Sequence, residues 1–173
     1  METKKYTRAE LTAMKEKSDT ALYTMTVAGV GIGFAPVMID IAALMTAMGV
    51  GVVAIGNCYG YKLNKADAGE LIKHFFRAAG MTYSFIFVGQ KITTSILKSN
   101  PVSYIPTMIA DAIMCGATAY AVGYTSQKYF HKQAEGAQAT VDDIKRWMKD
   151  GKKEGQKISK QKAEEEAAKR KAS

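Results

Sequence analysis

Residues 20–61 read TALYTMTVAGVGIGFAPVMIDIAALMTAMGVGVVAIGNCYGY, and this run carries a single charged residue, Asp40. A soluble amphipathic helix shows a polar face every third or fourth residue, whereas most of this run shows none. Pro36 lacks an amide hydrogen and clashes with the preceding turn, which disfavours one straight helix. The sequence therefore predicts two apolar helices, about 22–34 and 37–61, hinged at Pro36.

A second apolar pair is expected at about 81–98 and 104–131. Ser99-Asn100-Pro101 separates its two helices, and the second of them is entered at Pro106. When Glu10 is aligned with Glu70, similar residues also recur inside the two apolar pairs, which suggests an internal repeat. Chance matching among similar apolar segments is the alternative. The fold class that we predict is all-α, with two Pro-hinged apolar hairpins, amphipathic connecting helices and a charged helical tail.

Composition divides the chain into three parts: residues 1–18, 19–133 and 134–173. The first part is predicted to be a charged helix that begins with a capping box at Thr7 and Glu10. The middle part contains both hairpins, joined by a helix that Asn64 and Asp67 can start. The last part begins with a helix capped by Thr140 and interrupted at Gly151. We expect the Lys- and Glu-rich segment that follows to be solvated, with nothing to bury.

The distribution of charge favours a membrane. The formal net charge is +8, and lysine and arginine concentrate in the N-terminal arm, the 62–77 connector and the C-terminal tail. If both hairpins enter a bilayer, these basic segments share one side, which the positive-inside rule assigns to the cytoplasm. Small residues would let the helices approach closely, and the candidates for this packing role are Gly29, Gly33, Gly56, Gly60 and Gly123.

Other features of the hairpins oppose insertion. A spanning helix needs about 20 apolar residues, and the arm 22–34 is shorter than that. Lys91 lies in the middle of the arm 81–98, and Asp40 and Asp111 would be costly facing lipid. The hairpins could thus span the bilayer, form shallow wedges, oligomerise to hide polar groups or make a soluble helical core.

Asp40 and Asp111 are the main polar candidates, because each follows a proline (Pro36 or Pro106) within an apolar stretch. Each carboxylate could brace its hinge or pair with Lys91. The functional reading is a polar site or pore constriction formed on assembly. No set of residues has the spacing of a catalytic, cofactor or metal site, so we predict a non-enzymatic protein without cofactors.

Near the C-terminus, Ile144, Trp147 and Met148 fall on one side of the predicted helix. They could anchor it at a membrane interface, bind a protein partner or dock the helix back onto the domain. We do not expect nucleic-acid binding, because the lysines of the tail alternate with glutamates and no aromatic stacking platform accompanies them.

The order Pro36, Asp40, Ala-Leu-Met and a Gly-rich helix closing in Tyr59-Gly60 resembles a bacterial domain of unknown function. That domain is found in YcjF-like inner-membrane proteins and after the P-loop domain of some small GTPases. The run from Pro106 to Lys128-Tyr129-Phe130 resembles the closing helix of that family, so the similarity covers about residues 20–132. The resemblance implies a helical, membrane-linked domain that works with a GTPase. Because this chain carries no P-loop domain, we expect the GTPase to be a separate protein.

Together these patterns predict a homo-oligomeric helical protein of the inner membrane, with both termini cytoplasmic. It would anchor, remodel or permeate the membrane, bind anionic lipid through its basic segments and recruit a soluble partner such as a GTPase. The alternative is a soluble cytoplasmic adaptor that binds a protein through its C-terminal helix.

Overall fold

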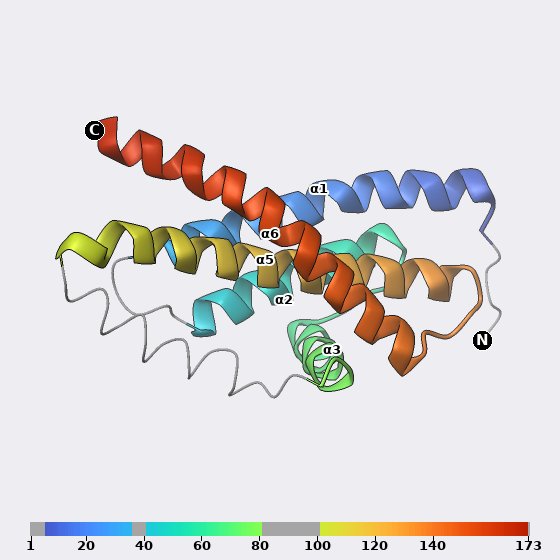
Figure 1. Ribbon diagram of the computed structural model, residues 1–173. Coiled ribbons are helices and arrows are strands. Elements are labelled where there is room, and N and C mark those ends of the chain that lie inside the picture. The colour runs from blue at the N-terminus through green and yellow to red at the C-terminus, as the bar shows by residue number, and fades with distance from the viewer. Residues whose placement is uncertain (1–5, 36–40, 81–100, 173) are drawn as a thin grey trace.

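The computed structural model describes residues 6–35, 41–80 and 101–172, and these residues form five α-helices and no strand (Figure 1). The predicted all-α class is therefore confirmed. The helices are α1 (Arg8–Gly33), α2 (Ile41–Cys58), α3 (Lys65–Ala78), α5 (Pro101–Ala134) and α6 (Val141–Ala172). Pro36, Asp40 and the predicted helix 81–98, which includes Lys91, lie outside the described residues.

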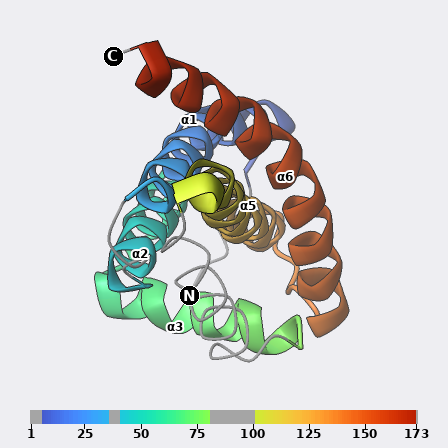
Figure 2. The same ribbon diagram turned by 60° about the vertical axis from the view of Figure 1, so that its left-hand side comes forward.

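The central helix is α5. Figure 2 shows α1, α2, α3 and α6 arranged around it. Its contacts with α6 and α1 are the most extensive in the fold, followed by those with α2. Residues 112–127 of α5 carry no charge on any side. A helix with this pattern is stable in the interior, where its whole circumference is covered by other helices.

Capping boxes begin α1, α3 and α6, as the sequence predicted. In each box the first side chain accepts a hydrogen bond from an amide three residues later, and the carboxylate at that later position accepts one from the first amide. The three pairs are Thr7 with Glu10, Asn64 with Asp67, and Thr140 with Asp143. Local side-chain chemistry therefore fixes where these helices start.

Three predicted helix boundaries are wrong. The expected break near residues 18–20 is absent, because α1 is one continuous 26-residue helix in which the Ser18 hydroxyl donates to the Lys15 carbonyl at 2.7 Å. Pro106 does not begin a helix but lies inside α5. Gly151 does not interrupt α6, which continues for 32 residues to Ala172.

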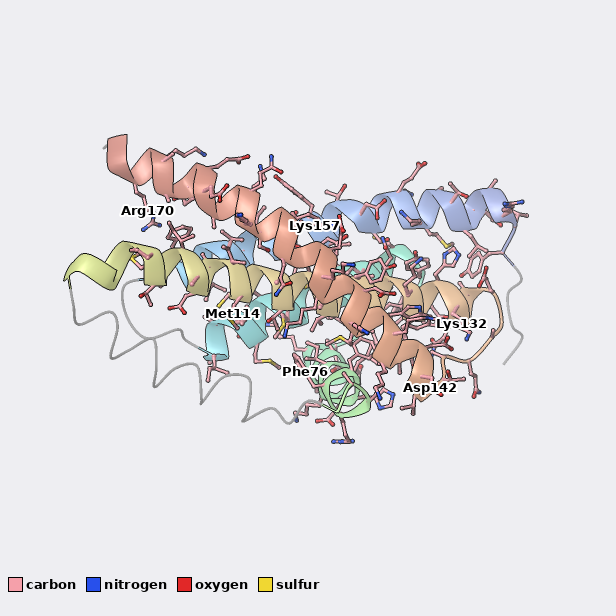
Figure 3. All side chains as sticks on the ribbon, viewed as in Figure 1. Phe76, Met114, Lys132, Asp142, Lys157 and Arg170 are labelled. Carbon is pink, nitrogen blue, oxygen red and sulfur yellow. The ribbon has the colours of Figure 1, made fainter. Side chains whose placement is uncertain are left out.

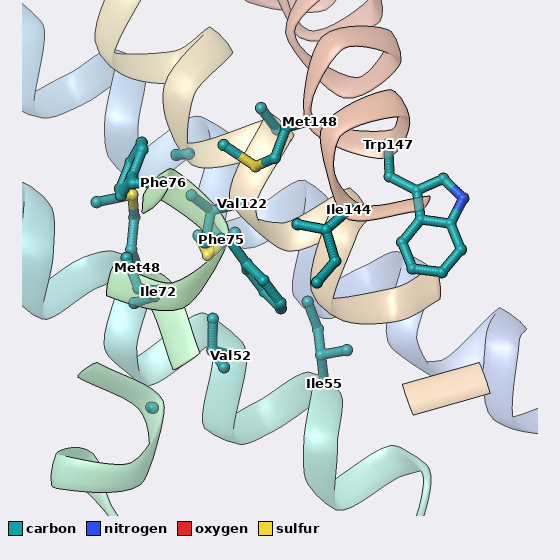
Figure 4. Packing of buried hydrophobic residues seen from close by; sticks show 14 of the residues in the cluster. Met48, Val52, Ile55, Ile72, Phe75, Phe76, Val122, Ile144, Trp147 and Met148 are labelled. Carbon is teal, nitrogen blue, oxygen red and sulfur yellow. The ribbon is translucent and has the colours of Figure 1, made fainter. Parts of the chain in front are cut away.

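The main core lies where α2, α3, α5 and α6 meet (Figure 4). Phe75 and Phe76 of α3 are at its centre, and the side chains around them come from all three other helices. These buried neighbours include Met48, Val52, Ile55, Val122, Ile144 and Met148. Full burial of each such side chain stabilises the fold by about 1.5–3 kcal/mol. The core therefore anchors the first turns of α6 firmly.

The rest of α6 is packed, although the sequence predicted a solvated tail with nothing to bury. Small residues at every fourth position, namely Gly151, Gly155, Ser159 and Ala163, lie on one face and are buried. A Cβ placed on Gly155 would lie 3.0 Å from Ala117 Cα of α5. The expectation failed because it counted large apolar residues, whereas this face packs backbone against backbone.

Candidate functional site

The feature most directly linked to function is the outer face of α2. No residue of Ile41–Cys58 is charged, and among the described helices this is the one long and apolar enough to cross a membrane. Only 33% of its residues are buried inside the fold. Val50 is the clearest case, with 55% of its surface exposed. The exposed positions of α2 are Ala42, Thr46, Val50 and Asn57, so its outward face is uncharged and mixes small apolar side chains with two polar ones.

The second half of α1 also exposes uncharged surface. Tyr23 and Val27 are 50% and 40% exposed, and residues 20–33 contain no charge. Because α1 and α2 pack against each other, they form a hairpin whose two helices both expose uncharged surface. We call residues 20–33 and 41–58 together the apolar hairpin.

Charged residues gather at the opposite end of the fold. The first turns of α1, the last turns of α5 and the first turns of α6 lie together at that end (Figure 1). Figure 3 shows Lys132 and Asp142 there, whereas Arg170, near the end of α6, lies at the far end. The uncharged parts of α1, α2 and α5 thus lie away from these first and last turns, whereas α6 carries further basic residues across them.

A polar cluster connects α1 to α5 at the charged end. Gln127 is 3% exposed, and its amide nitrogen donates to Ser18 Oγ at 2.8 Å and to Asp19 Oδ1 at 2.7 Å. Asp19 also pairs with Lys15 at 2.9 Å on the helix surface. These bonds fix the register of α1 on α5. They hold no pair of groups poised for proton transfer or nucleophilic attack, so we read the cluster as structural.

Aromatic side chains surround this cluster. The Tyr59 ring stacks on Phe130 with centroids 6.5 Å apart and meets His131 edge-on at 5.9 Å. Burial raises the pKa of the Tyr59 hydroxyl. Tyr59 follows α2 directly, so this stacking packs the C-terminal end of α2 against α5.

A groove runs along α6 over the surface of α5. One cavity of about 210 Å³ is lined by Asp19, Leu22, Tyr23, Thr26, Tyr120 and Ile158. A second, of about 300 Å³, is lined by Tyr124 and by residues of α6 that include Lys153 and Glu154. Tyr120 and Tyr124 stack with centroids 6.1 Å apart, so the two cavities are neighbours. Burial and the nearby Glu154 carboxylate raise the pKa of Tyr120.

The structure places four of the predicted packing glycines between helices. A Cβ on Gly29 would lie 3.1 Å from Gly116 Cα, and one on Gly33 would overlap the backbone at Ala112. Gly56 faces Leu63 and Phe130, and Gly123 faces Leu22 and Met25. Gly60 differs, because it lies beyond α2 with a φ of 81° and ends that helix in the left-handed region.

Of the predicted polar residues, Asp111 and Pro106 are described. Asp111 is buried, with 1% of its surface exposed, beside the Gly33 crossing, whereas Pro106 is exposed on α5. Whether Asp111 matches Asp40 in position, or pairs with Lys91, stays a prediction, because Asp40 and Lys91 lie outside the described residues.

The side chains of Ile144, Trp147 and Met148 dock back onto the chain's own core, where they are 1%, 9% and 1% exposed. They are therefore covered in this fold and do not form an exposed anchor or partner-docking surface. Their packing against α2, α3 and α5 provides the physical reason.

The sequence analysis overlooked three features: Gln127, Gly116 and the small-residue face of α6. The four-residue spacing of Gly151, Gly155, Ser159 and Ala163 was a readable signal. Gln127 had none, because an uncharged polar residue within an apolar helix does not indicate its partner. Among the described residues no group of three or more His, Cys, Asp or Glu side chains could hold a metal ion.

Comparison with known families matches residues 13–165 to a family described as Domain of unknown function (DUF697). The match extends the resemblance seen in residues 20–132 through most of α6. Neither the curated proteins nor the solved structures contain a significant match. Because the matched segment spans well over half of the chain, the protein belongs to the DUF697 family.

Proposed function

We propose that this chain is a non-enzymatic helical module that associates with a membrane through the outer face of α2. The observation that carries the proposal is that α2 is uncharged along its whole length while only 33% of it is buried. The core helix of a water-soluble domain is mostly covered by its neighbours, whereas α2 exposes Val50 and has no charge at any of its exposed positions. A lipid surface would cover the exposed part of α2.

The length of α2 gives this face a large extent. Its 18 residues extend about 27 Å at 1.5 Å per residue, and a helix that lies in the membrane surface can present that whole length to lipid. One face of α2 packs on α3 and α5. In the folded form we therefore propose that the helix lies in the membrane surface with Val50 toward lipid.

The partners follow from the charges and from the family. We propose that the exposed basic residues at the charged end, such as Arg8, Lys145 and Arg146, favour anionic lipid. We also propose that the protein acts at the inner membrane with cytoplasmic termini, as a homo-oligomer, together with a separate GTPase or other soluble effector. The size of the detergent-extracted protein, measured by light scattering, tests the oligomer.

Vesicle flotation tests membrane association. We expect Val50→Lys to weaken binding to vesicles containing anionic lipid by roughly tenfold, because the mutation removes from the face that meets lipid a valine side chain whose burial is worth about 1.5 kcal/mol. Since lysine is attracted to anionic headgroups, repulsion from the lipid surface cannot explain such a loss. The matched control is Gln156→Lys, at an exposed position of α6, which should bind as the unaltered protein does.

Two outcomes contradict the proposal. One is that the unaltered protein stays at the bottom of the gradient with every vesicle composition. The other is that Val50→Lys and Gln156→Lys bind equally well. In the second case the basic surface alone would drive binding and the face of α2 would have another role.

A further inference from the structure

We propose that residues 150–172 of α6 form a releasable cover over the apolar end of the fold, and that their release strengthens membrane binding. This inference rests on the proposed function and adds its regulation. We call residues 150–172 the cover and residues 141–149 the anchor.

The two parts of α6 are attached in different ways. The anchor buries large side chains, including Ile144 and Met148, in the main core. It is also tied to α5 through Asp143, which pairs with Lys132. The cover instead touches α5 through the small residues Gly155, Ser159 and Ala163. Small side chains remove little apolar surface from water, so they hold the cover less strongly than the anchor.

One buried group opposes docking of the cover. Ser159 is fully buried, and its hydroxyl has no hydrogen-bond partner among the described residues. A buried hydroxyl without a partner is costly, and release of the cover would return it to water. The buried Ser159 hydroxyl, which faces Gly116, thus lowers the stability of the docked cover.

Several ion pairs of the cover join residues within the cover, so they do not hold it to α5. Glu154 pairs with Lys157, Lys162 with Glu165, and Glu166 with Arg170. All are three or four residues apart along the helix and survive when α6 separates from α5. Among the contacts that cross the interface, Lys162 lies over the Tyr23 ring at 5.9 Å and Arg170 over the Phe34 ring at 4.9 Å.

The packing beside residues 150–158 and the glycines at the start of the cover also permit movement. The two cavities of the groove lie along the side of the cover at residues 150–158, so its packing there is incomplete. Gly151 and Gly155 are weak helix formers, each costing about 1 kcal/mol relative to alanine in a helix interior. The junction at Gly151 is therefore the natural hinge.

Apolar surface lies beneath the cover. Val30 and Phe34 of α1 and Met108 and Ala112 of α5 form a small cluster that Ala163 completes. Figure 1 shows α6 crossing this end of α1 and α5, and Figure 3 shows Lys157 over the middle of α5 and Arg170 beyond it. Lifting the cover would extend the exposed surface of the apolar hairpin from Val27 to Val30 and Phe34.

Thiol labelling in solution tests the release without any lipid. In a background carrying Cys58→Ser and Cys115→Ala, single cysteines are placed at Ala163→Cys in the cover and Met148→Cys in the anchor. Both positions are buried, at 0% and 1% exposure. We expect the cysteine at position 163 to react at least tenfold faster, because it is exposed by local release. Equal rates would show that both need global unfolding and would overturn the proposal.

A conservative substitution then links release to lipid binding. Ser159→Ala removes the unpartnered hydroxyl, so it should slow labelling at position 163 about tenfold and weaken vesicle binding by a similar factor. Because the change strengthens docking, unfolding cannot produce this result. Slower labelling with unchanged vesicle binding would overturn the regulatory role, whereas the proposed function would still be judged by Val50→Lys alone. Circular dichroism of each variant verifies its helix content.

Discussion

At the scale of single residues, Asp143 connects α5 to α6. Its carboxylate accepts hydrogen bonds from Lys132 and from the Thr140 amide, and it also pairs with Arg146 at 2.8 Å. The hydrogen bond from Lys132 is the main reason that the pKa of Asp143 lies well below its ordinary value, and the bonds from Thr140 add to it. The charged form of this aspartate therefore stabilises the folded state.

This lowered pKa predicts how stability changes with pH. The contribution of Asp143 should be complete above the ordinary aspartate pKa of about 3.9, should decrease below it, and should be lost as the pH falls through the lowered folded-state value. We expect Asp143→Asn to unfold at a lower denaturant concentration at pH 7, and the gap from the unaltered protein to narrow below pH 4.

The neighbouring Asp142 is exposed and provides the control, because Asp142→Asn should leave the unfolding midpoint nearly unchanged at both pH values. If the gap for Asp143→Asn stayed constant from pH 7 to pH 2, the charge of Asp143 would not be the source of its effect.

Sequence reasoning identified Thr140 and Asp143 because a capping box is local, with both partners within one turn. It did not identify Gln127, whose partners Ser18 and Asp19 lie on a helix far away in the chain. The same long-range bond explains why the helix break predicted near residue 18 is absent. A hydroxyl can cap a new helix or bond back within its own, and the packing of α5 on α1 favours the second.

At the scale of elements, α1 crosses α5 through glycine. A Cβ on Gly29 would lie 2.9 Å from the Cys115 carbonyl oxygen, whereas one on Gly31 would meet nothing within 4 Å. We expect Gly29→Ala to destabilise the protein by about 1–3 kcal/mol because backbone must move apart. Gly31→Ala should stabilise it by up to about 1 kcal/mol through better helix propensity. Denaturant unfolding of the two variants measures the contrast.

The two substitutions are the same chemical change in the same helix, so each is the control for the other. Equal destabilisation by both would mean that α1 needs backbone flexibility at its glycines rather than close approach to α5. Equal stabilisation would mean that the two helices can move apart at their crossing without cost.

The elements also show where sequence reasoning reached its limit. Uncharged runs indicated that α2 and α5 are helices of high apolarity, because that property is local to each segment. The course of α6 beyond Gly151 could not be obtained in this way, because Gly155 and Ser159 gain their packing value only from Gly116 and Ala117 on α5. Lysine and glutamate dominate the composition of that stretch. Its buried face consists of a single small residue in each turn, which a composition-based prediction does not detect.

At the scale of the whole molecule, the uncharged and charged segments of α1 and α5 lie at different ends, while α6 carries charge along its whole length. The uncharged parts of α1, α2 and α5 converge at one end, and the start of α6 and the end of α5 carry charge at the other (Figure 1). Sequence reasoning placed the N-terminal arm, the 62–77 connector and the C-terminal tail on one side, whereas the end of α6 lies at the opposite end of the fold from the start of α1 (Figure 1). Sequence reasoning also could not determine which face of α2 remains outside, since that depends on how α3 and α5 cover the helix.

This polarity predicts the orientation of the protein on a membrane. Nitroxide labels at Val50→Cys on α2 and Lys73→Cys on α3, in a background carrying Cys58→Ser and Cys115→Ala, report the two sides; both native side chains are more than half exposed. With anionic vesicles, we expect the label at position 50 to become accessible to oxygen and protected from a water-soluble nickel chelate. The label at position 73 should stay accessible to nickel, because α3 is amphipathic and exposes Lys73 and Arg77 to water. Protection at both positions would indicate burial of the whole domain, and protection at position 73 alone would place the basic helix against the lipid and reverse the orientation.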